Sequence, residues 1–462
     1  MTGDAMHFER SMTDAEALMW HVERDPWMSP SGGSLTLFDR PLDAIRFRRA
    51  MVDAVAAVPR LRQRVVEPAT PLGTPHWETD PELDLDWHVR HAGAPGDGGL
   101  DALLTWMTTF LQDPYDRTRP LWQYVVIDNL PDGLGALAVK IHHVVTDGKG
   151  AVRLGMHYTS LERDAAGPTD TDLEAVIAHD VATERRTTGA ARDLVGDALR
   201  LPKTAGRSLV DALAHPERLL GTRKDVEGLA RTATDQLRPA GASLWTHRSR
   251  RRAMAAFSIP FAEGRAAAKS LGGSLNDLFL TGVVEAAARY HEALHAPLER
   301  VHATFVVSTR TDASGDTNAF TPVPVDLPVV TGGLQERFTA VQQALALRRA
   351  DVSGEGPFAA VAPLANVLPT GVVTSIARSQ AAHIDVATSN LPGYLGDSYI
   401  AGAKTLHTYV FGPVAGTACN VTLYTTAGSI DVGVHLDPAA ITDADRWQQC
   451  LAASFHDLVA CA

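Results

Sequence analysis

The sequence predicts an α/β protein made of two lobes joined by a helical connector. Three observations support this fold class. β-rich runs alternate with helical periods early in the chain, the same texture returns in the second half, and residues 170–244 between them are polar, alanine-rich and helical in period. The 462 residues are enough to bury two large cores. We place the first lobe at 1–180, the connector at 181–245 and the second lobe at 246–462.

Charge and cysteine content exclude several classes of protein. There are 42 Lys and Arg against 54 Asp and Glu, a net charge of −12, so no general attraction to nucleic acid or anionic lipid is expected. An anionic ligand therefore needs a local basic patch. The cysteines, Cys419, Cys450 and Cys461, are too few and too widely spaced for a disulfide framework or a zinc site. They indicate a reducing compartment.

The N-terminus and one apolar stretch indicate in which cellular compartment the protein is expected. The first residues carry acids where a signal peptide needs a basic segment and then an apolar one, so we expect a cytoplasmic protein. Residues 356–377 are free of charge, but Pro357, Pro363 and Pro369 argue against a membrane-spanning helix. We expect this stretch to line the second lobe, with docking at a lipid surface as the alternative.

The first lobe begins with a predicted helix and a hairpin. The helix follows Arg40 and ends at Pro59. Its apolar residues at helical spacing are Leu42, Ile45, Val52 and Val55. Residues 121–128 and 136–145 are β-rich and separated by a turn rich in Pro and Gly, which predicts an antiparallel hairpin. A helix follows through Gly148.

The connector and second lobe complete the prediction. Pro202 and Pro216 interrupt the connector, which we read as a solvated linker, with an interfacial membrane helix as the alternative. The second lobe is predicted to contain strands at 253–260 and 303–310, a helix opening at 272–294, a turn at 389–393, a strand at 405–414, a hairpin that turns at 427–428, and a closing amphipathic helix.

The chemistry is concentrated at the end of the predicted hairpin. No GxSxG elbow, P-loop, GxGxxG opening a helix, HExxH or CxxC occurs, but His142 and His143 end an apolar strand and are followed by Asp147 and Gly148. Successive side chains on a strand point to opposite faces, so one histidine acts and the other supports. Imidazole is suited to deprotonating an alcohol near neutral pH.

Asp147 and Gly148 are expected to position the acting histidine. Asp147 would hold the turn rigid through a buried ion pair or backbone hydrogen bonds, and Gly148 would permit a tight exit from the strand. The alternative is that the histidine pair is simply a satisfied, half-buried pair of structural residues.

The motif HHxxxDG, residues 142–148, resembles the signature of the acyltransferase superfamily that includes chloramphenicol acetyltransferase and peptide-synthetase condensation domains. More narrowly, the chain is similar to the bacterial wax ester synthase/diacylglycerol acyltransferase family. The similarity extends over nearly the whole chain, because further segments match in order and spacing. These are PRLRQRVV (59–66), RPLW (119–122), LNDLFL (275–280), VVSTR (306–310) and SNLPG (389–393).

The resemblance implies two chloramphenicol-acetyltransferase-like α/β sandwich lobes with the active-site tunnel between them. It also implies that His143 removes the hydroxyl proton of an acceptor alcohol, which attacks the thioester of a long-chain acyl-CoA. The acceptor would be diacylglycerol, giving triacylglycerol, or a long-chain alcohol, giving a wax ester. Acyl-CoA is then a co-substrate, and no metal or other cofactor is expected.

Further candidate substrate-binding residues can each be interpreted as structural or as functional. Ser274 and Asp277 form a capping-box pattern, so Asn276 and Asp277 either start a helix or contact substrate. Trp122 is either a core residue at a strand entry or part of the acyl-binding wall. In the expected turn at 389–393, Ser389 and Asn390 are substrate-binding candidates, and the Asn390 amide is suited to the thioester oxygen.

Two more features concern binding. Arg310 is a candidate partner of Asp147 or Asp277 and is grouped with the substrate-binding residues. Leu391 stands where the family more often has valine. The basic run 247–252 is either a solvated face or a site for the phosphates of CoA.

Two alternatives to this function remain open. A related acyltransferase would take its acyl group from a carrier protein to make a cell-envelope lipid ester, and a lipid-binding protein would keep the fold without turnover. Because the acceptors barely dissolve, we also expect possible peripheral contact with the inner membrane or lipid droplets, and no nucleic-acid partner.

Overall fold

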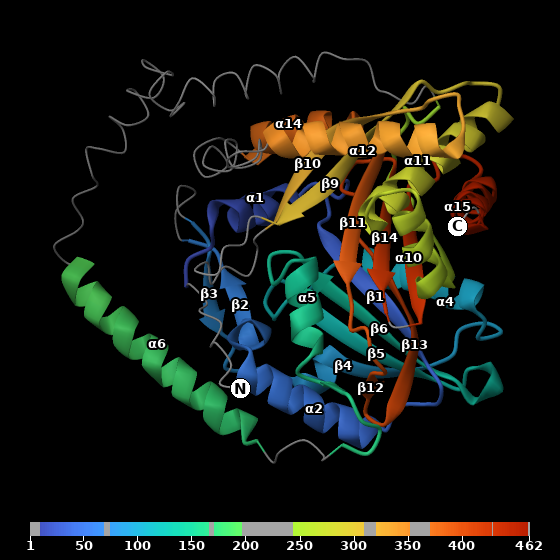
Figure 1. Ribbon diagram of the computed structural model, residues 1–462. Helices are drawn as coiled ribbons and strands as arrows, with labels where there is room; N and C mark the ends of the chain where they lie inside the picture. Colours follow the sequence, from blue (N-terminus) through green and yellow to red (C-terminus); the bar gives the residue numbers. More distant parts are fainter. Residues whose placement is uncertain are drawn as a thin grey trace, which may run out of the picture.

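The structure is a computed structural model of the 462-residue chain. It describes residues 10–68, 74–165, 171–195, 244–308, 320–351, 370–426 and 428–460. Two large β-sheets, each carrying helices, make up the two lobes (Figure 1). The predicted two-lobed α/β fold is confirmed.

The first lobe is built on a seven-stranded sheet. In spatial order its strands are β4 (Val89–Gly93), β5 (Trp122–Asp128), β6 (Gly135–His142), β1 (Ser31–Phe38), β13 (Ala403–Phe411), β12 (Tyr399–Ile400) and β7 (Thr159–Ser160). β5 and β6 pair antiparallel, which confirms the predicted hairpin. β2 (Gln63–Val66) and β3 (His76–Thr79) form a separate two-stranded sheet.

The second lobe is built on a six-stranded sheet. Its spatial order is β10 (Phe320–Pro328), β9 (Arg300–Ser308), β11 (Val386–Pro392), β14 (Cys419–Thr425), β15 (Ser429–Leu436) and β8 (Ala253–Pro260). β14 and β15 form the predicted antiparallel hairpin. β14 and β15 are buried at almost every position because elements cover both faces of this sheet.

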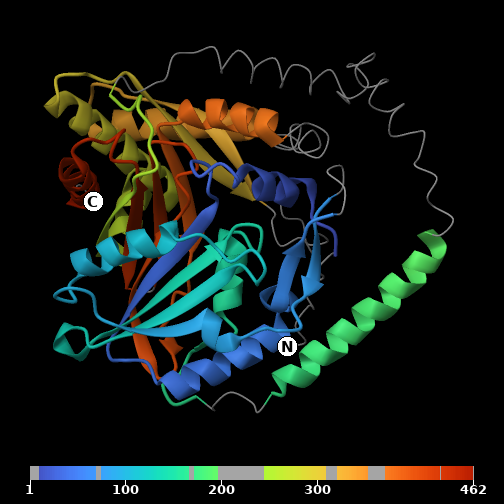
Figure 2. The same cartoon turned by 180° about the vertical axis from the view of Figure 1, so that it is seen from behind.

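Helices cover both sheets and bridge the lobes. Those of the first lobe are α1 (Asp14–Val22), α2 (Ala44–Ala57), α3 (Leu85–His88), α4 (Leu100–Gln112), α5 (Gly148–Gly155) and α6 (Leu173–Val195), with 3-10 turns η1 (Pro59–Arg62) and η2 (Pro131–Gly133). Those of the second lobe are α10 (Phe261–Ser270), α11 (Leu275–Ala293), α12 (Leu334–Asp351), α14 (Thr370–Ala382) and α15 (Ala444–Ala460). α4 contacts β8 and α1 contacts α14, so both pairs join the lobes. Seen from behind, α4 and α1 lie along the boundary between them (Figure 2).

β13 comes from the C-terminal half of the chain but belongs to the first sheet. It pairs antiparallel with β1 and at the same time lies against β14 and β15 of the second sheet. Gly433 on β15 makes this close approach possible, because a Cβ there would lie 2.2 Å from the Val410 carbonyl oxygen. The division at 1–180, 181–245 and 246–462 stays a prediction, but the sheets do not follow it.

Three sequence predictions about local structure were wrong. Ile45 was placed on the apolar stripe of α2, yet its side chain is exposed, because Phe47, Met51, Ala54 and Val55 form the face that packs into the core. The strand predicted to reach Val145 ends at His142, where the Val145 N–H turns back to the His142 carbonyl. Residues 389–393 were predicted as a turn, but 389–392 belong to β11, with Pro392 at its end where a missing N–H costs little.

Other predictions fall partly outside the described residues. α6 confirms helix at the start of the connector and packs along α2 and β3, but 196–243 lie outside the described ranges. Of the apolar stretch 356–377, only 370–377 is described, as part of α14. Within the described parts of the chain, none of the helices is long and apolar enough to span a membrane.

Candidate active site

The HHxxxDG segment forms the junction between β6 and α5. His142 is the last residue of β6, and His143 lies in the turn that follows. Asp147 caps α5, because its Oδ1 accepts a hydrogen bond from the Gly150 N–H at 2.6 Å. This backbone hydrogen bond is one of the two ways in which Asp147 was expected to hold the turn.

His142 is fully buried and anchored at both ring nitrogens. Its Nδ1 accepts from the Val144 N–H at 3.0 Å, and its Nε2 lies 3.0 Å from Oε2 of Glu23. Because Nδ1 is the acceptor, the proton sits on Nε2 and faces the carboxylate. Trp20 and Tyr115 contact the ring edge-on. His142 is therefore a supporting residue, since neither nitrogen is available to a substrate.

Glu23 is a site residue that sequence reasoning missed. It follows the last residue of α1, and the side chain is 17% exposed. Burial acts to raise the pKa of its carboxyl, but the hydrogen bond from His142 and the charges of Arg117 and Lys140 outweigh burial and lower the pKa. Nothing in the sequence signals a contact between residues so far apart along the chain.

His143 lies close to β1 and to the end of β13. A Cβ built on Gly32 of β1 would lie 3.6 Å from His143 Nε2, 3.3 Å from the Phe411 carbonyl oxygen and 3.8 Å from Pro413. Nε2 therefore sits where β1 meets the end of β13. Burial, and secondarily the neighbouring His142, lower the pKa of His143 to about 4, with Asp147 acting in the opposite direction. The imidazole is neutral at physiological pH.

Gly148 lies in close contact with Leu391 of β11. A Cβ on Gly148 would lie 2.9 Å from Cδ2 of Leu391, so the first turn of α5 rests directly on β11. That Gly148 permits a tight exit from the strand stays a prediction; the structure adds this close approach of two lobes. Leu391, the position noted for its departure from valine, thus contacts the histidine motif.

The registers of the second sheet place a row of residues on the face toward the first lobe. Leu391 pairs with Tyr424, Tyr424 with Asp431, and Asp431 with Ser258. Directly paired residues share a face, so this row extends from the Leu391 contact with α5 across to β8. Ser389, two residues before Leu391 on β11, lies on the same face, which keeps it a substrate-binding candidate.

Asn390 and Asn276 are brought together, on the other face of β11. The Asn390 Nδ2 donates to Oδ1 of Asn276 at the start of α11, over 3.3 Å. Strand alternation turns Asn390 away from the face that carries Leu391. A role for Asn390 or Asn276 in holding substrate stays a prediction.

Ser274 caps α11, and Asp277 completes the capping box that the sequence pattern predicts. Its Oδ2 accepts from the Ser274 N–H and hydroxyl, each at 2.8 Å, and the Asp277 N–H returns a bond to Ser274 Oγ. Arg310, the proposed partner of Asp147 or Asp277, lies outside the described residues.

Trp122 lies in the core of the first lobe. It is fully buried, its indole N–H donates to the Leu61 carbonyl at 2.8 Å, and its ring stacks on His88. This matches the reading as a core residue at a strand entry. Its role in an acyl-binding wall stays a prediction.

Comparison with known proteins identifies the family of the chain. The family model described as the wax ester synthase/diacylglycerol acyltransferase catalytic domain matches residues 12–279, and that of the WS/DGAT C-terminal domain matches residues 317–459. A Mycobacterium tuberculosis protein named "Putative diacyglycerol O-acyltransferase" is 33% identical over 100% of this chain and 94% of its own length.

Solved structures agree with this at the level of fold. A wax ester synthase/diacylglycerol acyltransferase from Marinobacter aquaeolei superposes with a TM-score of 0.66 at 21% identity, covering 97% of this chain and 98% of that one. The first condensation domain of the calcium-dependent antibiotic synthetase gives a TM-score of 0.60 at 17% identity, covering 98% of both chains. The chain belongs to the wax ester synthase/diacylglycerol acyltransferase family and is an acyltransferase.

Proposed function

We propose that the protein transfers a long-chain acyl group from acyl-CoA to the hydroxyl of diacylglycerol, of a long-chain alcohol, or of both, with His143 as general base. The observation that carries this proposal is the position of the His143 imidazole. Its Nε2 lies 3.6 Å from the position that a Cβ on Gly32 would take, where β1 meets the end of β13, whereas His142 is held by Glu23. A neutral imidazole in that position is able to accept a hydroxyl proton.

The proposed reaction balances with one proton shuttle. As the acceptor oxygen attacks the thioester carbonyl carbon, its proton passes to Nε2 of His143. The tetrahedral intermediate collapses, the C–S bond breaks, and the leaving thiolate takes the proton back from the imidazolium. An ester and free CoA result, and His143 returns to its neutral form.

The remaining residues of the motif hold His143 and the start of α5 in position. His142, through Glu23 and the Val144 N–H, fixes the end of β6 from which His143 projects. Asp147 fixes the start of α5 through Gly150, and Gly148 allows α5 to rest on Leu391. Holding a base within a fraction of an ångström of its working position contributes strongly to rate. No metal or redox cofactor enters the proposed reaction.

The proposed acceptors are apolar, so the protein would meet them at a surface where they collect. Peripheral contact with a membrane or a lipid droplet is part of this proposal. The alternatives are an acyl carrier protein as donor for a cell-envelope ester, and lipid binding without turnover.

The test is acceptor-dependent release of CoA from palmitoyl-CoA, with diacylglycerol and hexadecanol compared side by side. We expect His143→Ala to lower the rate by about a hundredfold or more at unchanged circular dichroism, because a general base usually contributes roughly a hundred- to ten-thousandfold. His456→Ala is the matched control, since His456 is exposed on α15, and it should keep full activity.

Each outcome has a definite meaning. The acceptor that supports release identifies the preferred alcohol. Full activity in His143→Ala would exclude His143 as the base. If the unmodified protein releases no CoA with either alcohol but transfers acyl groups from a carrier protein, the donor is wrong, and lipid binding without either reaction would support the binding protein.

A further inference from the structure

A cavity lies at the boundary of the two lobes, next to the proposed base. It has a volume of about 580 Å³. Its lining residues come from the segment before β1, the end of α4, the segment after β13, the segment before β8, and β15. Ser31 and Val414 belong to the lining, and they are the chain neighbours of Gly32 and Pro413. A Cβ on Gly32 would lie 3.6 Å from His143 Nε2 and 3.8 Å from Pro413. The cavity lining therefore includes the residues next to those that surround the Gly32 position near His143 Nε2.

Three consecutive arginines, Arg250, Arg251 and Arg252, line this cavity. The two residues that precede them are anchored by hydrogen bonds. The preceding Arg248 donates to the carbonyls of Gly416 at 2.9 Å and Ala382 at 3.1 Å, and the Ser249 hydroxyl donates to Asp437 at 2.6 Å. The sequence left open whether the basic run 247–252 is a solvated face or an anion site. In the structure Arg248 and Ser249 anchor the run, and Arg250, Arg251 and Arg252 line the cavity.

The charges on this wall are not balanced locally. Arg252 lies 3.8 Å from the buried Asp437 carboxylate, which offsets its charge. Arg250 and Arg251 are exposed, and within the described residues neither guanidinium has a carboxylate partner. In a chain with a net charge of −12, two uncompensated arginines on a cavity wall favour an anionic ligand, and arginine binds phosphate oxygens in bidentate fashion.

A buried histidine adds a second, independent feature to the same cavity. His435 on β15 lines it and is 5% exposed. Its Nδ1 lies 2.9 Å from the Gly412 carbonyl oxygen, so Nδ1 carries the proton and Nε2 is an acceptor. Nε2 is buried and has no hydrogen-bond partner in the part of the chain that the structure describes. A buried acceptor of this kind calls for a donor on a ligand.

We propose that this cavity is the donor subsite: Arg250 and Arg251 bind the phosphates of CoA, and His435 Nε2 accepts a hydrogen bond from an amide N–H of the pantetheine arm. The phosphates then lie at the outer, cationic wall, and the thioester reaches His143 past Ser31 and Val414. This assignment rests on the proposed function, since it takes acyl-CoA as the donor.

The first test separates the phosphates from the rest of the donor. The double variant Arg250→Gln/Arg251→Gln should raise KM for palmitoyl-CoA about tenfold or more with kcat little changed, because charge-assisted hydrogen bonds are lost in binding. With S-palmitoylpantetheine, which carries no phosphate, variant and unmodified protein should have equal kcat/KM. Arg265→Gln, at an exposed arginine of α10, is the matched control.

The second test addresses His435. His435→Phe removes the acceptor and should raise KM for both palmitoyl-CoA and S-palmitoylpantetheine several-fold, whereas His435→Gln keeps a carbonyl acceptor and should recover much of the loss. An unchanged KM for S-palmitoylpantetheine in a folded His435→Phe would overturn the role of this residue.

Failure of the subsite is distinguishable from failure of the function. If acyl transfer occurs and needs His143 but the arginine variant keeps the KM for palmitoyl-CoA, the subsite is wrong and the function stands. If no transfer occurs, calorimetric binding of CoA itself decides, since the arginine variant must bind it at least tenfold more weakly. If the variant instead loses only sedimentation with phosphatidylglycerol vesicles, the arginines bind lipid headgroups and the proposal is overturned.

Discussion

At the scale of single residues, the two adjacent histidines have opposite environments. His142 is hydrogen-bonded at Nδ1 and faces a carboxylate at Nε2, whereas His143 stands at the junction of β1 and β13 with its pKa lowered to about 4, chiefly by burial. The adjacent side chains diverge because the backbone turns immediately after β6. These environments support our assignment of His142 as the supporting residue and our proposal of His143 as the base.

The lowered pKa of His143 predicts activity that persists into acid. A general base works only when deprotonated, so activity is lost as pH falls through the pKa, here about 4, whereas an unperturbed histidine would lose it near 6.5. We expect kcat/KM to stay nearly constant from pH 7 to about 5. The measurement is a pH–rate profile, with each sample returned to pH 7 to confirm recovery. An acid limb centred at 6.5 would contradict this.

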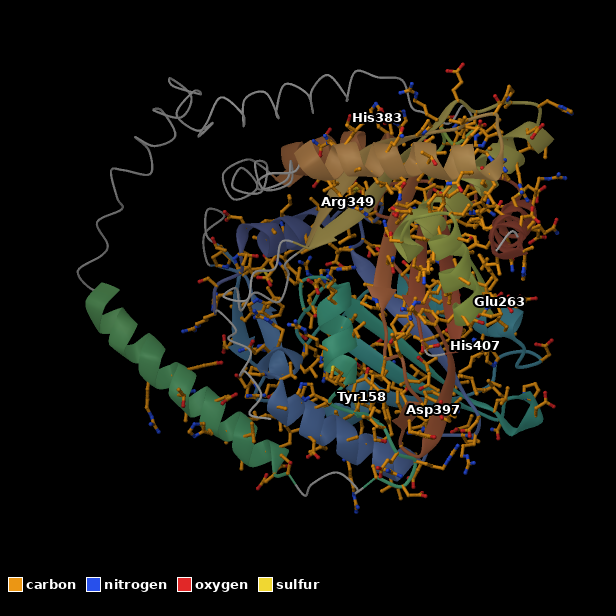
Figure 3. The ribbon with its side chains drawn as sticks, viewed as in Figure 1. Tyr158, Glu263, Arg349, His383, Asp397 and His407 are labelled. Atoms are coloured by element: carbon orange, nitrogen blue, oxygen red, sulfur yellow. The ribbon has the colours of Figure 1, made fainter. Side chains whose placement is uncertain are left out.

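Substitution of Glu23 is expected to disturb the position of His142 and of the end of β6. Glu23→Ala leaves the His142 Nε2–H without its acceptor, so the end of β6 loosens and kcat should fall about tenfold to a hundredfold with KM little changed. Glu23→Gln keeps a carbonyl acceptor and should retain most activity. Glu263→Ala, at an exposed acid of α10, is the control (Figure 3). Equal loss in the Ala and Gln variants would show that charge, and not the hydrogen bond, matters.

At the scale of elements, the contact between α5 and β11 connects the histidine motif to the second lobe. Leu391 rests on Gly148 so closely that a Cβ at Gly148 would meet its methyl group at 2.9 Å. The helix that begins at Asp147 is thus held at one end by its cap and on one side by β11. Gly148 and Leu391 form a complementary pair across the lobe boundary.

This pair predicts coupling between two substitutions. Gly148→Ala should destabilise the protein by about 1 kcal/mol or more, because the Leu391 side chain must shift to avoid the new methyl group. Leu391→Val removes the clashing atoms, so the double variant should be more stable than the sum of the two single effects. Urea unfolding of all four proteins gives the coupling energy. Strict additivity would contradict direct contact.

At the scale of the whole molecule, β13 is the element that makes two sheets into one structure. Asp431, fully buried on β15, accepts hydrogen bonds from Ser258 Oγ at 2.6 Å and from the Thr408 N–H at 2.8 Å, and its Oδ1 lies 2.9 Å from His407 Nδ1. Figure 3 shows His407 on β13 beside this boundary, with Asp397 and Tyr158 below it. One carboxylate thus joins β8, β13 and β15.

Removing the Asp431 carboxylate should weaken the contacts between the two sheets and lower the stability of the protein. Asp431→Asn is expected to lower the free energy of unfolding by about 2 to 4 kcal/mol, because a buried network loses its charge and part of its hydrogen bonding. The control is Asp397→Asn, whose partner Lys404 is also at the surface, and it should cost less than about 1 kcal/mol. Calorimetry measures both, and equal effects would contradict the role of Asp431.

Much of this architecture could be predicted from local sequence. The β5–β6 and β14–β15 hairpins, the Ser274–Asp277 capping box and the closing helix all rest on residues close together in the chain. Prediction from sequence failed where the conformation or burial of a residue depends on elements distant in the chain. Ile45 fits helical spacing but faces solvent. Residues 389–392 have the composition of a turn but form a strand because they pair with β14. Periodicity does not reveal which face a neighbour will cover.

The sequence by itself determined the two-lobed α/β class, the family and the histidine motif, because short local patterns and their order along the chain indicate all three. Only the tertiary structure decided that Glu23 holds His142, that Leu391 rests on Gly148, and that Arg250 and His435 share a cavity beside His143. These contacts join residues up to hundreds of positions apart. They depend on how distant elements pack, for example on β13, which pairs with β1 and packs against β14 and β15, and no local pattern encodes that packing.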